Sequence, residues 1–128
     1  VCDELEEPGF LLRTGYTYSG HQASCAAGIA NIELMEAEGL VERVDHIGER
    51  LRAGLTALEG DGLIESWRGM GAIYAAELGR DAVSARDKML EAGVILRPMG
   101  TCLAICPPLV ITDDEIGRII DAMADALR

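Results

Sequence analysis

The sequence predicts an α+β domain in which a small, mostly antiparallel sheet packs against helices. Two observations support this prediction. Apolar residues recur at three- and four-residue steps in several segments, and short strand-like runs alternate with turns rich in glycine and proline. The expected order is helix, helix, strand, strand, helix, strand, strand, helix. With 128 residues, of which 49% are hydrophobic, the chain is long enough to bury one ordinary core.

The first half of the chain is expected to hold two helical segments. The first is predicted to start at Ser19, because Ser19 and Gln22 have the spacing of a Ser-x-x-Gln capping box, and small residues continue to Leu34. Gly39 interrupts the pattern, and an amphipathic helix is expected over residues 40–58. The spacing allows either one kinked helix or two.

The second half is expected to be rich in turns. Strands are predicted over 63–68 and 72–78, joined around residues 69–71, and again over 94–97 and 102–106, joined around residues 98–100. Between the two pairs, Asp81 is expected to cap a helix that Gly93 ends. A last helix is expected after a full capping box of Thr112 and Glu115, with Ile116, Ile119, Ile120, Met123 and Leu127 on its apolar face.

Charge and cysteine usage exclude several classes of function. Eleven basic and twenty-two acidic residues give a net charge of −11, which disfavours binding to nucleic acid or to acidic membranes. No apolar run is long enough to span a membrane, and the first residues do not resemble a signal peptide. The four cysteines are sparse and form no Cys-x-x-Cys pair, which favours a cytoplasmic protein with reduced, buried thiols. The missing initiator methionine suggests a piece of a longer chain.

The residues that usually carry covalent or metal chemistry give little support for either. Lys88 is the only lysine, and its place in a probable surface helix predicts a solvated charge and not a Schiff-base nucleophile. His21 and His46 lack the spacing of metal ligands, and Cys102 and Cys106 would stand roughly 13 Å apart along one strand. No metal site is expected. Trp67 is expected to pack in the core.

The segment Gly15-Tyr16-Thr17-Tyr18-Ser19-Gly20-His21 is the most suggestive of a binding site. It places hydroxyl groups and glycines at an expected helix N-terminus, where free N–H groups and the helix dipole favour an anion. Taken alone, these residues also fit a simple helix cap, which is the commoner use of serine and threonine at that position.

This segment resembles the Gly-Tyr-Thr-Tyr-Ser-Gly-His-Pro signature of class-III aminotransferases, the omega-transaminase group that uses pyridoxal phosphate. Further pieces resemble the same family, in family order and across essentially the whole chain: residues 10–13, 26–27, 36–40, 68–71, 93–98 and 107–112. One departure is Gln22, where the family usually has proline. Both residues suit the first turn of a helix.

The resemblance implies the C-terminal portion of a fold-type-I transaminase, which transfers an amino group from an amine or omega-amino acid to a keto acid. Thr17 matches the residue that reaches the cofactor phosphate of the neighbouring subunit in a homodimer, and Ser19 stands beside it. Arg97 matches the family's mobile carboxylate-binding arginine, a role that suits its planar guanidinium. Tyr16 is expected to line the neighbouring subunit's site. The cofactor lysine is expected outside this chain, so no catalytic residue is assigned within it.

Under this interpretation, residues 1–18 belong to a large domain or connecting segment, residues 19–58 form bridging helices, and residues 59–128 form a small C-terminal domain. Two alternatives stay open at this stage. One is a free-standing domain that binds a small molecule. The other is an oligomerisation module that uses the alanine-rich face at 23–34.

Overall fold

The computed structural model describes residues 15–128, so the predicted features at residues 1–14, including the 10–13 run, lie outside the described residues. The chain divides into two compact units, residues 1–34 and 35–128, and each is described by itself. The domain boundaries inferred from the resemblance, at residues 18 and 58, stay predictions about a longer protein. No helix among the described residues is long and apolar enough to cross a membrane.

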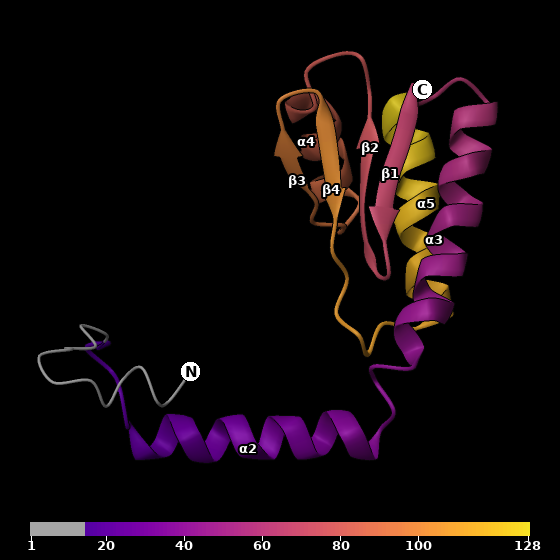
Figure 1. Cartoon of the computed structure of the whole chain (residues 1–128). Coiled ribbons are helices and arrows are strands. Elements are labelled where there is room, and N and C mark those ends of the chain that lie inside the picture. The colour runs from indigo at the N-terminus through magenta and orange to yellow at the C-terminus, as the bar shows by residue number, and fades with distance from the viewer. Residues whose placement is uncertain (1–14) are drawn as a thin grey trace, which may run out of the picture. The chain divides into compact units, whose positions relative to one another are not determined.

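The second unit contains a four-stranded antiparallel sheet, which confirms the predicted α+β class (Figure 1). Its strands are β1 (Ser66–Met70), β2 (Ile73–Glu77), β3 (Arg97–Met99) and β4 (Cys102–Ile105). Their order in the sheet is β1-β2-β4-β3, so the two hairpins predicted from sequence join through β2 and β4. Both hairpins turn at a glycine with positive φ, Gly71 and Gly100, where residues with a β-carbon would be strained.

Three helices cover one face of this sheet: α3 (Arg43–Gly60), α4 (Val83–Glu91) and α5 (Asp113–Leu127). Alternate residues of β2 and β4, among them Tyr74 and Leu103, point toward these helices and are almost fully buried. The largest fully buried side chains are Ile47, Leu51, Leu55, Tyr74, Met89, Leu103, Ile105, Ile116 and Met123. Trp67 lies half-buried at the edge of this core, with its ring 5.8 Å from that of Tyr74.

Three predicted element boundaries are wrong for one physical reason. Helices α2 (Gln22–Ala37), α3 and α4 are each followed by a glycine with positive φ, and the next residue donates its N–H to a carbonyl five residues back. Those donors are Leu40, Leu63 and Val94, which the sequence analysis assigned to the next helix or strand. This hydrogen-bond pattern is the Schellman motif, in which an apolar residue folds back on the helix it ends. The following elements therefore begin later, at Arg43, Ser66 and Arg97.

The other helix starts were predicted with mixed success. Thr112 and Glu115 form the full capping box expected at α5. At α4 the cap position is Ala82, one residue later than predicted, although Asp81 still accepts a hydrogen bond from the Val83 N–H. The break predicted at Gly39 is real, so α2 and α3 are two separate helices.

Candidate functional site

The segment before α2 forms a tight turn that organises the predicted anion-binding residues. The Ser19 N–H donates to the Tyr16 carbonyl at 3.0 Å, and the Tyr16 N–H donates to Ser19 Oγ at 3.2 Å. Because Ser19 Oγ accepts this hydrogen bond, its own proton remains available to another acceptor. Thr17 is exposed and has no hydrogen-bond partner among residues 15–128. The segment therefore offers two hydroxyl donors close to a helix start.

The expected Ser19–Gln22 capping box is wrong, because α2 begins only at Gln22. Gly20 has φ +71° and turns the chain between Ser19 and the helix. The cap is His21, whose Nδ1 accepts from the Ser24 N–H at 3.2 Å and lies 3.0 Å from the Ser24 hydroxyl. This role was not predicted, because histidine is an uncommon cap. Ser19 is thereby released from capping.

Arg97 begins β3, in the second unit. It pairs with Ala104 of β4, while the next residue, Pro98, faces the helices opposite Leu103. Pro98 and Met99 were expected in the turn but belong to the strand, and the turn is formed by Gly100 and Thr101. Arg97 therefore points to the face of the sheet that the helices leave uncovered. Its guanidinium is exposed and has no partner among the described residues.

A network that the sequence analysis did not identify crosses the same face of the sheet. The Arg68 guanidinium on β1 donates to Cys102 Sγ on β4 at 3.4 Å, and the Cys102 thiol donates to Glu77 Oε2 on β2 at 2.8 Å. Donation from the Cys102 thiol, followed by that from the Thr101 hydroxyl, lowers the pKa of Glu77. Strand alternation was the available signal, because it places residues 68 and 77 on one face once the register is known.

Of the cysteines in residues 15–128, Cys102 is buried as predicted, but Cys25 and Cys106 are exposed. Cys106 follows the end of β4 and so does not share that strand with Cys102. No cluster of three or more His, Cys, Asp or Glu side chains in the described part of the chain could hold a metal ion.

Lys88 does not fit the role of a cofactor lysine. Its Nζ donates at 3.0 Å to the carbonyl of Ala126, near the end of α5, and so ties α4 to α5. The lysine stands on an exposed position of its helix, as predicted, although this hydrogen bond to α5 was not foreseen. A Schiff-base lysine needs a free, desolvated amine, and this amine has neither property.

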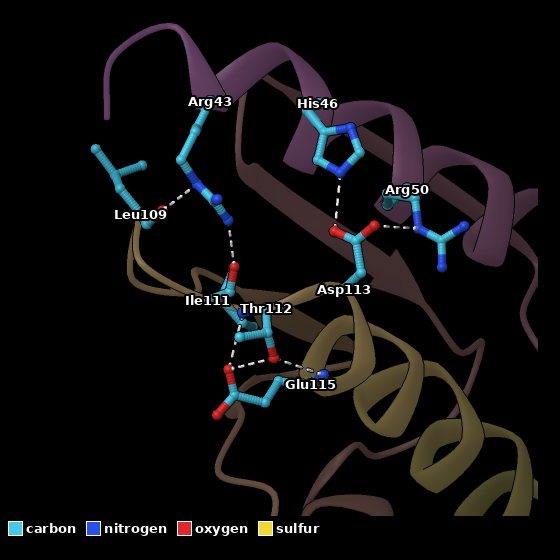
Figure 2. Close-up of polar contacts among 8 residues, drawn as sticks. All are labelled: Arg43, His46, Arg50, Leu109, Ile111, Thr112, Asp113 and Glu115. Atoms are coloured by element: carbon cyan, nitrogen blue, oxygen red, sulfur yellow. Dashed lines mark hydrogen bonds and ion pairs between the residues drawn. The ribbon is translucent and has the colours of Figure 1, made fainter. Parts of the chain in front are cut away.

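The segment between β4 and α5 is fixed by side chains from α3 (Figure 2). Arg43 donates to the carbonyls of Leu109 and Ile111. His46 Nε2 donates to Asp113 Oδ1 at 2.8 Å, and this hydrogen bond is the main reason that the pKa of Asp113 is lowered. These contacts hold the turn over residues 108–111, which borders a surface cavity of about 290 Å³ beside the start of α5.

A family model described as aminotransferase class-III matches residues 3–127. A gamma-aminobutyrate transaminase of Solanum lycopersicum is 30% identical over 89% of this chain, and an ornithine aminotransferase of Emericella nidulans is 30% identical over 94% of it. The chain spans only 25% and 27% of the lengths of these two relatives.

Solved structures give the same result. An omega transaminase from Pseudomonas jessenii has a TM-score of 0.86 and 33% identity, and the match covers 98% of this chain and 30% of that one. An amine transaminase from an uncultivated Pseudomonas species, solved with PLP bound, has a TM-score of 0.84 and 30% identity. This second match covers 91% of this chain and 30% of that one.

Proposed function

The chain belongs to the class-III aminotransferase family. We propose that it forms the C-terminal part of an enzyme that transfers an amino group from an amine or omega-amino acid to a keto acid. The observation that carries the proposal is the continuous family match over residues 3–127, supported by the TM-score of 0.86 against an omega transaminase. The whole enzyme's chemistry also depends on residues outside this chain.

The proposed cofactor is pyridoxal phosphate, which when bound supplies the carbonyl that accepts the amino group. The residues present fit part of such a site. The hydroxyls of Thr17 and Ser19 are available to donate to a phosphate, and the first N–H groups of α2 have no acceptor within their own helix. The reactive lysine is assigned to the part of the enzyme outside this chain, because the Lys88 amine is bound to the Ala126 carbonyl.

Arg97 is proposed to bind the carboxylate of the substrate. It stands at the beginning of β3 on the uncovered face of the sheet, free of any partner among the described residues. A guanidinium can donate two parallel hydrogen bonds to a carboxylate, and a free side chain can move aside for a substrate without one. Tyr16 is proposed to line the site of a neighbouring subunit, in a homodimer whose cofactor phosphate Thr17 contacts. The free thiols of Cys25, Cys102 and Cys106 support a reducing compartment, for which we propose the cytoplasm.

The test uses the full-length enzyme that contains this sequence, assayed with a keto-acid acceptor and with an uncharged aldehyde acceptor. Removing a hydrogen bond to a charged group costs about 1.5–3 kcal/mol, or roughly ten- to hundredfold in affinity. Arg97→Ala should therefore raise KM for the keto acid by about that factor and spare the aldehyde. Thr17→Ala should weaken cofactor retention without changing this acceptor preference.

Arg118→Ala is the matched control, because Arg118 is an exposed arginine on α5, one of the helices on the opposite side of the sheet from Arg97. Equal impairment of both acceptors by Arg97→Ala would make Arg97 a structural residue. Absence of amino transfer from any amine to any keto acid by the unaltered enzyme would refute the proposed function itself.

A further inference from the structure

The face of the sheet opposite the helices carries an unusual combination of side chains. No element of residues 35–128 covers this face, which is turned toward the viewer in Figure 1. We term it the open face. Its residues follow from the strand register: Ser66, Arg68 and Met70 on β1, Ile73, Ala75 and Glu77 on β2, Cys102 and Ala104 on β4, and Arg97 and Met99 on β3.

One row across the open face consists of two arginines separated by two alanines. Arg68 pairs with Ala75, Ala75 pairs with Ala104, and Ala104 pairs with Arg97. The two central strands thus contribute only methyl groups at this level. The long side chains of Arg68 and Arg97 flank them, one on each side. The low surface that Ala75 and Ala104 form between the two arginines is termed the floor. A small ligand can approach the backbone of β2 and β4 closely only because these two positions are alanine.

The Arg68 side chain is directed inward over β2, along the edge of this floor that borders the next row, in which Glu77 pairs with Cys102. Its guanidinium donates to Cys102 on β4, the strand next to the one that carries Arg97. Neighbouring strands lie about 4.8 Å apart, so the contact brings the Arg68 charge about one strand closer to Arg97 than its own backbone. The Cys102 thiol is in turn bound to Glu77, which fixes the sulfur that holds the guanidinium.

Arg97 has no anionic partner among the described residues, and Arg68 has only Glu77, to which it is linked through the Cys102 thiol and by electrostatic attraction. Neither makes an ion pair with a carboxylate of the described residues, although the chain carries a net charge of −11. Glu77 is the acidic group on the open face, and its carboxylate accepts hydrogen bonds from the Cys102 thiol and the Gly79 N–H. Two guanidinium groups that face one open floor repel each other until an anion lies between them.

We propose that Arg68 and Arg97 together bind one carboxylate group on the Ala75–Ala104 floor, so that Arg68 is a second carboxylate-binding residue beside Arg97. Identifying this carboxylate as that of the keto-acid acceptor rests on the proposed function. The binding surface itself does not. Cys102 acts as a positioning residue, because its sulfur holds the Arg68 guanidinium beside the floor.

The experiment titrates the 128-residue chain with sodium butyrate and follows the arginine Nε–Hε signals and backbone amides by NMR. Butyramide, which has the same shape and no charge, is the ligand control. Butyrate is expected to shift the side-chain signals of Arg68 and Arg97 and the amides of Ala75 and Ala104. Loss of one exposed charged contact should weaken binding about three- to tenfold, for Arg68→Met and Arg97→Met alike.

Three further variants keep the proposal falsifiable if one substitution disturbs the sheet. Ala75→Leu fills the floor and leaves both charges in place, so it should abolish the butyrate shifts. Arg68→Lys keeps the charge without the planar fork and should bind more weakly than the unaltered chain. Arg118→Met removes an arginine from α5 and should leave the affinity unchanged.

The proposal is overturned if butyrate and butyramide give the same shifts, if Arg68→Met leaves the affinity unchanged, or if Arg118→Met weakens binding as much as Arg68→Met. None of these results requires cofactor or turnover. A chain that binds butyrate as described, in an enzyme that transfers no amino group, would therefore refute the proposed function and leave the site standing.

Discussion

Adding one methyl group at Gly48 should destabilise the chain, although the same change in an exposed helix stabilises it. Gly48 lies in the buried face of α3, directly against the turn between β1 and β2. A β-carbon there would overlap the carbonyl oxygen of Gly71 and would come within 3.4 Å of the Tyr74 hydroxyl. Because the overlapping atom belongs to the backbone, the hairpin and the helix would have to separate.

The expected magnitude follows from two opposing effects. Replacing glycine by alanine inside a helix gains up to about 1 kcal/mol of unfolding free energy. Forcing extra volume into a packed contact costs about 1–3 kcal/mol, and the higher end applies here because no flexible side chain can yield. Gly48→Ala should therefore lower the free energy of unfolding by about 1–2 kcal/mol.

Gly117→Ala provides the matched comparison. Gly117 lies in α5 of the same unit, and a β-carbon there would have no heavy atom within 4 Å. Only the propensity gain remains, so this variant should be more stable by up to about 1 kcal/mol. Urea unfolding of both variants, followed by circular dichroism, measures the difference. If the two changes shift the urea midpoint in the same direction, the contact between α3 and the hairpin turn does not constrain the fold as argued.

Two other predictions concern the start of α5. Thr112→Ala removes the capping box and should lower the free energy of unfolding by about 1 kcal/mol. Thr56→Ala, at an exposed position inside α3, should not lower it. Equal urea midpoints for the two variants would contradict this prediction. The pKa of Asp113 is lowered in the folded chain, chiefly by the hydrogen bond from His46, so its stabilising effect is present above its ordinary pKa near 3.8 and is lost as the pH falls through the lowered value. Asp113→Asn should therefore reduce the fall in unfolding free energy below about pH 4, measured by urea unfolding at a series of pH values. An unchanged pH dependence in this range would show that the His46–Asp113 pair does not contribute to the free energy of unfolding.

Local signals were sufficient to predict most elements but not where several of them begin. The apolar period of α5 and its capping residues lie within a few positions, and both were predicted correctly. Leu40, Leu63 and Val94 were misassigned because each is an apolar residue after a glycine, a pattern shared by the start of a new element and by the end of a Schellman motif. Only the hydrogen bond back to the helix distinguishes the two.

The candidate site shows the same division between local and long-range information. Arg97 could be proposed because its neighbours in the chain resemble a family motif. Arg68 could not, because its relation to Arg97 depends on the pairing of β2 with β4, which joins segments about thirty residues apart. The sequence also gave no sign that Cys102 would hold the Arg68 guanidinium. Sequence neighbours thus predicted which residue types matter, whereas the sheet register determines which of them share a surface.

Helix α2 supplies the strongest physical reason to regard the chain as part of a larger enzyme. None of its residues is buried in the described structure. Ile29, Ile32 and Leu34 are each more than half exposed. At roughly 100° per residue, Ile29 and Ile32 share one side of the helix and Leu34 points to nearly the opposite side. A soluble helix with apolar residues on opposite sides is normally enclosed by other elements. One partner helix could cover the alanine-rich face predicted from the sequence. Apolar residues on two opposite sides call for more than one partner element, and that is what the far longer chains of the matched transaminases can provide.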